Sequence, residues 1–573
     1  MKKKNFVSLL SLIVAVVILS SCGGLKKMQK LANTVQYTVT PPILEMHADS
    51  VEVSISGKFP AKYFHKSAII EATPVLKYEG GEKAYKVQKL QGEKVEENNP
   101  VISYVDGGSF SYLATIPYVD NMKISDLEIR IHAKIKKKEA DFDPIKIADG
   151  VIATPILVQP DAKAIIGKDK FQRIISDSKI ADIHFKIQQA AVQGSELKAE
   201  DIVALKEYIA EAKENERKEF KGVSISAYAS PDGALDLNTK LSDKRGKEAV
   251  KFANKEFKKV EEAENENFIS STTTPEDWDG FKSELQSSEL ADKDLILRVL
   301  SMHSDPEIRE REIKNMAKTY LELADKVLPK LRRSKINVNV DLIGYSDEEL
   351  VQIFNAKPDS LNVEELLFTG TLFDDFNDKL KVYKAVAEVY PTDWRGFNNV
   401  GYAYINLGKI SDAKIAFENA KKLDASNTIV LNNLGVCALL ENDVVTAEEF
   451  FTSATGAGSE VNYNLGIVNI KKADYPAAVN FFGTACSFNA GLAKLLNDDN
   501  DGAVKAVDCA ENKDDAINFY LKAIVGARSA NTDLMFNNLR AAISKDAKWN
   551  AYAKTDMEFF KYFDDDTFKS VVK

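Results

Sequence analysis

Hydrophobic and polar residues alternate through the first part of the chain. Val51, Val53 and Ile55 are separated by single polar residues, and a similar alternation runs from Ile124 to Ile135. A period of two places successive side chains on opposite faces of a strand, so it predicts strands with one buried face. Pro and Gly pairs between these stretches mark turns. The pattern predicts an all-β domain over residues 35–162, built as an antiparallel sandwich.

Strand and helix patterns mix in the next part of the chain. Residues 183–187 and 223–228 alternate as strands, and 336–342 is a third such stretch. In residues 199–212, hydrophobic side chains recur three and four positions apart, which is the period of an amphipathic helix. These elements predict an α+β domain over residues 163–350. Its helical part before the last strand is longer than a plain β-α-β-α-β outline requires.

From residue 360 onward the pattern is helical, and it repeats. Large and small residues of one unit recur about 34 positions later, which is the period of the tetratricopeptide repeat. The first unit consists of Phe397, Val400, Gly401, Tyr404, Gly408, Ala413, Phe417 and Ala420. The resemblance implies an all-α solenoid over residues 360–573, whose concave face binds a protein or peptide.

Polar side chains on the predicted first helices of these repeats are candidates for binding a partner. An Asn amide can both donate to and accept from a peptide backbone. The alternative is a polar face that contacts only solvent. We expect exposed, partner-binding side chains at Asn398, Asn399, Asn432, Asn433, Tyr463 and Asn464.

The N-terminus carries the features of a targeting segment. Three lysines precede an apolar core at residues 6–19, and Leu19-Ser20-Ser21-Cys22-Gly23 follows. The charge and length of this segment are typical of a signal peptide, and its end resembles a bacterial lipobox. The resemblance implies a signal peptide over 1–21, acyl chains on Cys22 and a linker over 22–34. The resemblance also implies, from Gly at position 23, an anchor in the outer membrane that faces the periplasm, while an uncleaved anchor is the alternative.

The stretch 222–250 carries the clearest candidate site in the central domain. Its strand ends in the turn 230–233, and a helix follows in which Asn238, Ser242 and Arg245 share one polar stripe. A guanidinium group can grip a carboxylate through two parallel hydrogen bonds. A carboxylate site between the turn and this helix is therefore expected.

The helix also fits the pattern N-x-x-L-S-x-x-R, which resembles the OmpA-like peptidoglycan-binding domain. That resemblance implies that Arg245 binds the carboxylate of diaminopimelate in the peptidoglycan stem peptide. The family places an Asp at the end of the preceding strand, but this chain has Ser230 there. Asp232, two residues later, is the expected substitute. The alternative is that Asn238 and Arg245 only brace the turn.

Composition excludes several other classes of function. Hydrophobic residues make up 45% of the chain and charged residues 28%, ordinary values for a globular protein. The net charge of −10 argues against nucleic acid as the main partner. Five histidines with no catalytic or metal-ligand spacing, and no Gly-rich phosphate loop, predict no enzyme, no metal and no cofactor.

Three of the four cysteines, Cys437, Cys486 and Cys509, lie in the predicted helices. They are expected to be small buried residues, with a disulfide between Cys486 and Cys509 as the alternative in an oxidising periplasm.

The whole sequence predicts a multidomain protein with an N-terminal all-β sandwich, a central α+β OmpA-like domain and a C-terminal all-α tetratricopeptide solenoid. The function expected from it is that of a lipoprotein that anchors the outer membrane to peptidoglycan, while its solenoid scaffolds a protein partner. The alternative is an assembly or scaffold subunit of an outer-membrane, fimbrial or secretion complex that binds no peptidoglycan.

Overall fold

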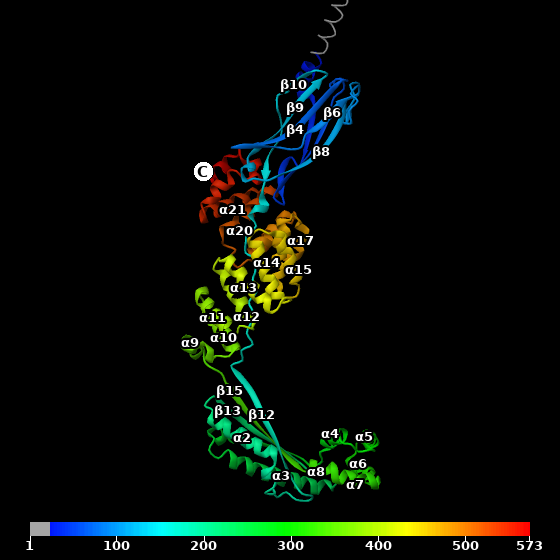
Figure 1. The fold of residues 1–573 in the computed structure, drawn as a ribbon, viewed down its shortest axis with the longest axis vertical. Coiled ribbons are helices and arrows are strands. Elements are labelled where there is room, and N and C mark those ends of the chain that lie inside the picture. Colours follow the sequence, from blue (N-terminus) through cyan, green and yellow to red (C-terminus); the bar gives the residue numbers. More distant parts are fainter. Residues whose placement is uncertain (1–22) are drawn as a thin grey trace, which may run out of the picture. The chain divides into compact units, whose positions relative to one another are not determined.

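The chain forms two compact units in the computed structural model, which describes residues 23–573 apart from the side chains of 317 and 318 (Figure 1). One unit joins the part of the chain up to Lys168 with Phe373–Lys573, and the other is Asp169–Leu372. The predicted lipidation site, Cys22, lies outside the described residues.

The first unit begins with a β-rich domain. Its sheet runs β1-β3-β2-β11-β9-β4-β6-β7, with β8 on β3, β10 on β9 and β5 on β4. The predicted alternations are present, since every second residue of β3 and of β9 is buried. Both strands contribute to one hydrophobic core. The strands are β1 Gln36–Thr40, β2 Ile43–His47, β3 Ser50–Phe59, β4 Ala68–Tyr78, β5 Gly81–Ala84, β6 Gln88–Gly92, β7 Val101–Ile102, β8 Gly108–Pro117, β9 Ser125–Ile135, β10 Lys138–Asp141 and β11 Ile145–Ile152.

The prediction of a linker over residues 22–34 is wrong for the described residues 23–34. Residues 23–30 are helical, and a 3-10 turn, η1 Ala32–Thr34, follows. Leu25 and Met28 are buried in the core of the β-rich domain. Their apolar side chains lie three positions apart, so one face of this short helix can be removed from water.

The second unit contains a four-stranded sheet in the order β12-β15-β13-β14. β15 is antiparallel to β12 and β13, whereas β13 and β14 are parallel. The strands are β12 Ile174–His184, β13 Lys218–Tyr228, β14 Ile269–Thr274 and β15 Arg333–Ile343. The helices are α2 Glu200–Glu214, α3 Leu235–Glu256, α9 Asp347–Ala356 and α10 Val363–Thr369, with short 3-10 turns at η4 Glu196–Lys198, η5 Glu261–Glu264, η6 Pro358–Ser360 and η7 Gly370–Leu372.

Two features of this sheet differ from the sequence prediction. Of the strand expected at 183–187, only residues 183 and 184 are strand; they are the end of β12, which begins nine residues earlier. β14 was not expected, because its sequence, Ile-Ser-Ser-Thr-Thr-Thr, has no alternation of hydrophobic and polar residues. It forms an edge strand, where only one side must pair.

The enlarged helical part forms a small bundle between β14 and β15. It has its own hydrophobic core, which includes Phe281, Leu300 and Leu328. The bundle is held to the sheet by Arg333, whose guanidinium lies 3.2 Å from the carboxylate of Asp277. Its helices are α4 Trp278–Ser287, α5 Lys293–Met302, α6 Pro306–Asn315, α7 Ala317–Lys326 and α8 Leu328–Leu331.

The C-terminal part of the first unit is a series of helix pairs with the predicted repeat. A Cβ on Gly401 would come within 2.5 Å of the Phe417 ring, and one on Gly435 within 2.6 Å of Phe451. Glycine is needed at these positions because the aromatic ring of the second helix lies against the backbone of the first. The helices are α11 Phe376–Val389, α12 Trp394–Asn406, α13 Ile410–Leu423, α14 Thr428–Leu440, α15 Val444–Ser453, α16 Ser459–Lys471, α17 Tyr475–Phe482, α18 Phe488–Leu496, α19 Asn500–Asp508, α20 Ala516–Arg528, α21 Thr532–Lys545, α22 Lys548–Ala553 and α23 Asp566–Val571, with a 3-10 turn at η8 Met557–Tyr562.

The tight helix pairs give a first prediction. Ala413 and Ala447 are fully buried, so Ala413→Trp or Ala447→Trp should overpack the pair and lower the free energy of unfolding by roughly 1–3 kcal/mol. Chemical denaturation of the full chain measures this change. Ile415→Trp is the matched control, because Ile415 lies on the same helix as Ala413 but is 63% exposed. An equal effect of both substitutions at 413 and 415 would contradict the packing argument.

The cysteines divide between the two outcomes that the sequence left open. Cys486 and Cys509 form a disulfide, with their Cα atoms 5.3 Å apart. Cys437 is buried and unbonded, and burial raises the pKa of its thiol to about 12.

Candidate functional site

A stretch of the chain's own backbone lies along the first helices of the repeats. We call residues 157–168 the bound segment; it follows the β-rich domain and precedes the second unit. It contacts α12, α14, α16 and α18 through their asparagines. Figure 1 shows it as a cyan stretch of coil beside α12 and α14. Residues 163–168, predicted as the start of the central domain, therefore belong to the repeat array.

Four asparagines each hold one residue of the bound segment by two hydrogen bonds to its backbone. In every case the side-chain oxygen accepts the backbone N–H, and the side-chain nitrogen donates to the C=O of the same residue. The pairs are Gln159 with Asn489 (2.8 and 2.9 Å), Lys163 with Asn464 (2.6 and 2.9 Å), Ile165 with Asn433 (2.7 and 2.7 Å) and Gly167 with Asn399 (2.7 and 2.9 Å). This arrangement satisfies the backbone of an extended chain much as a neighbouring strand would.

Two further asparagines tie these pairs together. Asn398 donates to the carbonyl of Ile165 at 3.1 Å, and Asn432 donates to that of Lys163 at 3.0 Å. The Asn398 oxygen also accepts from Asn433 at 2.9 Å. We call these six side chains (Asn398, Asn399, Asn432, Asn433, Asn464 and Asn489) the asparagine ladder; each is at most 1% exposed. Buried amides need such partners, because an unpaired one costs about 1–3 kcal/mol.

Side chains of the bound segment are recognised at alternate positions. The Tyr463 hydroxyl donates to the Asp161 carboxylate at 2.6 Å, and burial together with Asp161 raises the pKa of that hydroxyl. Ile165 is buried in a core shared with the repeats. A Cβ on Gly167 would lie 2.9 Å from Arg395, so little beyond hydrogen fits there. The repeat array thus recognises the side chains of an acid and an isoleucine, and the small size of a glycine, along one extended chain.

The predicted partner-binding residues require one correction. They were expected to be exposed, but the five asparagines among them are buried beneath the bound segment, and Tyr463 packs against it as well. The sequence prediction missed Asn489 and missed the segment itself. Asn489 had a signal, since Asn-x-Gly recurs at Asn399, Asn433, Asn464 and Asn489.

The predicted carboxylate site of the second unit is assembled around a small cavity. Asp232, Asn238 and Arg245 line a cavity of about 60 Å³, together with Ser230 and Arg332. Ser242, the fourth predicted residue, is buried in α3 and donates to the carbonyl of Thr239, so it lies outside the lining.

Arg245 is buried among backbone carbonyls. Its guanidinium donates to the carbonyls of Tyr228 at 2.8 Å and Gln189 at 3.1 Å, with a longer contact to Lys186 at 3.5 Å. Burial, reinforced by the nearby Arg332, lowers the pKa of Arg245 to about 10, so it stays charged at neutral pH. These contacts join the turn after β13 to the loop after β12.

Asp232, the expected substitute for the Asp of the family, pairs with Arg332 and Ser230. Its carboxylate lies 3.2 Å from the guanidinium of Arg332 and accepts from the hydroxyl of Ser230. Arg332 lies 100 positions later in the chain, just before β15, so sequence spacing around the turn could not reveal it. Asn238 donates to the carbonyls of Ser230 and Gly233 and so fixes the turn.

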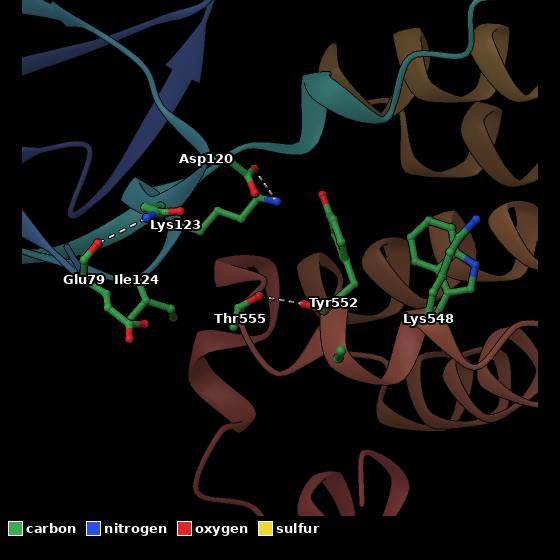
Figure 2. Close-up of a pocket in the computed structure, with 10 residues that line it drawn as sticks. Glu79, Asp120, Lys123, Ile124, Lys548, Tyr552 and Thr555 are labelled. Atoms are coloured by element: carbon green, nitrogen blue, oxygen red, sulfur yellow. Dashed lines mark hydrogen bonds and ion pairs between the residues drawn. The ribbon is translucent and has the colours of Figure 1, made fainter. Parts of the chain in front are cut away.

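A larger cleft of about 760 Å³ lies between the β-rich domain and the last helices of the same unit (Figure 2). Lys123 spans it, with its ammonium 2.7 Å from Asp120 and 4.4 Å above the Tyr552 ring. Its lining mixes both signs of charge with aromatic rings, which favours no single class of ligand.

Residues 23–573 contain no cluster of His, Cys, Asp and Glu arranged to hold a metal ion. Over the same residues, every helix is too short or too polar to cross a membrane.

Comparison with known proteins supports the repeat array. The family model of the tetratricopeptide repeat matches residues 395–427. No curated protein matches the chain in sequence. The chain thus carries C-terminal tetratricopeptide repeats.

The solved structures that this chain matches include the Cut9–Hcn1 hetero-tetramer of the APC/C, with 15% identity and a TM-score of 0.33 over 59% of this chain and 75% of that chain. A tetratricopeptide repeat protein from Parabacteroides merdae has 12% identity and a TM-score of 0.29, over 44% of this chain and 99% of that one. Pseudomonas aeruginosa pilF has 14% identity and a TM-score of 0.28, over 37% and 98%.

Proposed function

We propose that the protein is a non-catalytic scaffold of the bacterial cell envelope, held to the outer membrane by acyl chains on Cys22. The observation that carries this proposal is the asparagine ladder. Paired amides that hold an extended backbone serve protein–protein recognition, and they leave the side chains between them free to set specificity. The Cys486–Cys509 disulfide supports an oxidising compartment such as the periplasm.

In the absence of a partner, the bound segment occupies the asparagine ladder. The same backbone stretch joins the β-rich domain to the repeats, so the ladder fixes these two parts of the first unit to each other. A partner of the scaffold therefore either binds surfaces outside the ladder or replaces the bound segment. Pull-down of envelope proteins by the full chain, with and without Asn433→Ala, tests this proposal. Partners retained equally by both proteins bind outside the ladder, and an absence of specific partners for either would contradict a scaffold.

Attachment to the membrane gives a second prediction. Cys22→Ser removes the thiol that would be acylated, and several acyl chains contribute about 0.8 kcal/mol for each buried CH₂. The variant should therefore leave the membrane fraction and appear as soluble material, which fractionation and immunoblotting measure. A variant that stays with the membrane after a salt wash would show another attachment.

Peptidoglycan anchoring is the second candidate function, and the cavity beside Arg245 favours it. The contacts of Arg245 use three of the five N–H groups of a guanidinium. A cavity of about 60 Å³ has room for roughly two waters of about 30 Å³ each, or for one carboxylate. A stem peptide could thus enter only with the end of its diaminopimelate side chain.

Purified sacculi test this candidate directly. If the cavity binds the stem peptide, sacculi should retain the full chain, and free diaminopimelate should release it. The matched variant is Asp232→Asn, which at nearly constant volume removes the carboxylate proposed to attract the ammonium of diaminopimelate and should therefore weaken retention. Failure of sacculi to retain the chain would leave the scaffold as the function without a wall contact.

A further inference from the structure

The outer edge of β12 is a long open strand of the second unit. β12 ends the sheet order β12-β15-β13-β14, and among the described strands only β15 pairs with it. Three of its isoleucines are unusually exposed, at 56% for Ile174, 47% for Ile175 and 52% for Ile180. Unpaired edges that carry apolar side chains readily add another strand.

The outward-facing backbone N–H groups have different partners in the two halves of this edge. In the C-terminal half, the N–H of Asp182 donates to the Asp201 carboxylate at 2.8 Å, and the N–H of His184 donates to Glu196 at 3.1 Å. These alternate residues point away from β15, and helical carboxylates occupy their donors. In the N-terminal half, the corresponding N–H of Ser178 donates only to the carboxylate of its neighbour Asp177, at 2.8 Å. The open edge is therefore residues 174–180.

We propose that this open edge pairs with the same edge of a second copy of the chain. The two strands run antiparallel about a two-fold axis through Ser178, which faces its own copy, so that residues 176–180 of the two copies pair. Asp177 of each copy then lies opposite Lys179 of the other, on the same face of the joined sheet. The Ser178 N–H passes from its neighbour's carboxylate to the facing backbone, and the Asp177 carboxylate turns to the partner's ammonium.

Charge selects this register over those with an axis through 176, 177 or 179. An axis through residue 177 would place Asp177 opposite Asp177, and an axis through 179 would place Lys179 opposite Lys179. An axis through 176 would bring Lys179 opposite Arg173. Like charges in direct opposition destabilise a strand pair, whereas opposite charges stabilise it. The same two charges discourage pairing with unrelated apolar strands, so the edge is selective for itself.

Cysteine crosslinking tests the proposed axis. Directly facing residues of a hydrogen-bonded antiparallel pair have Cα atoms about 5.5 Å apart, a separation that suits a disulfide. Ser178→Cys in the detergent-solubilised full chain should therefore give a disulfide-linked dimer under mild oxidation. Ser176→Cys is the matched control, because its copy would lie four residues away, about 13 Å along the strand. Equal crosslinking at both positions, or none at 178, would overturn the proposal.

Charge exchange provides a test that does not require oxidation. Asp177→Lys alone and Lys179→Asp alone each create two like-charge pairs across the axis. Analytical ultracentrifugation should show the dimer dissociation constant rising about tenfold for each single variant, and the double variant D177K/K179D should restore it. A wild-type chain that remains monomeric at about 100 μM would refute the inference, as would single variants that dimerise as the wild type does. The result is independent of sacculus binding, which concerns the cavity beside Arg245.

Discussion

Asn433→Ala is expected to free the bound segment from the repeats and to lower the free energy of unfolding of the first unit by about 3–4 kcal/mol. Asn433 holds both the N–H and the C=O of Ile165 and also donates to Asn398. Alanine removes these bonds and leaves the buried Ile165 N–H and the Asn398 oxygen without this partner. Each such unpaired group costs about 1–3 kcal/mol, which is a large fraction of the stability of a typical domain.

Limited trypsinolysis measures the release of the segment. Lys163 lies inside it, and an extended backbone held by the ladder at both its N–H and C=O resists cleavage. The variant should be cut after Lys163 at least tenfold faster than the wild type, as peptide mass spectrometry can follow. Asn462→Ala is the matched control, since Asn462 is exposed on α16, two residues before Asn464. Equal cleavage of all three proteins would show that the ladder does not hold the segment.

The repeat array could be predicted from the sequence because its determinants are local and periodic. Gly401 and Phe417 are in contact because two consecutive helices pair, and their spacing in the sequence is enough to predict that pairing. The ladder residues were also visible, since Asn433 precedes the repeat glycine by two positions. What they bind was not, because the bound segment lies hundreds of positions away and carries no pattern of its own.

The central site was predicted in part for a similar reason. The turn and helix of 222–250 placed Asp232, Asn238 and Arg245 around one cavity. The partners of these side chains come from elsewhere, as the Arg332 ion pair with Asp232 and the Gln189 carbonyl beside Arg245 show. Burial of an arginine depends on the loop that covers it, and the helix pattern contains no information about that loop.

Arg245→Ala is expected to lower the free energy of unfolding of the second unit by roughly 3–5 kcal/mol. The side chain is 1% exposed and is among the largest fully buried ones in the chain. Its removal leaves the carbonyls of Tyr228 and Gln189 without this donor and removes the cation that lies 5.2 Å from the Phe185 ring. Water that enters the enlarged cavity would hydrogen-bond to these carbonyls and recover part of the lost free energy, which is why the expected range extends down to about 3 kcal/mol.

Chemical denaturation measures this loss in a full chain that carries Trp394→Phe and Trp549→Phe, because Trp278 of the second unit is then its one tryptophan and its fluorescence reports that unit. Lys244→Ala is the control, because Lys244 is the exposed neighbour on the same helix. Arg245→Lys keeps the charge, but a single ammonium cannot reach both the Tyr228 and Gln189 carbonyls with the geometry of a guanidinium, so it should restore only part of the stability.

Sacculus retention, measured at a temperature where each variant is folded, separates the two roles of the residue. A carboxylate ligand predicts at least tenfold weaker retention for folded Arg245→Ala, about 1.4 kcal/mol. A variant that keeps wild-type stability would instead show that the carbonyl contacts do not brace the turn.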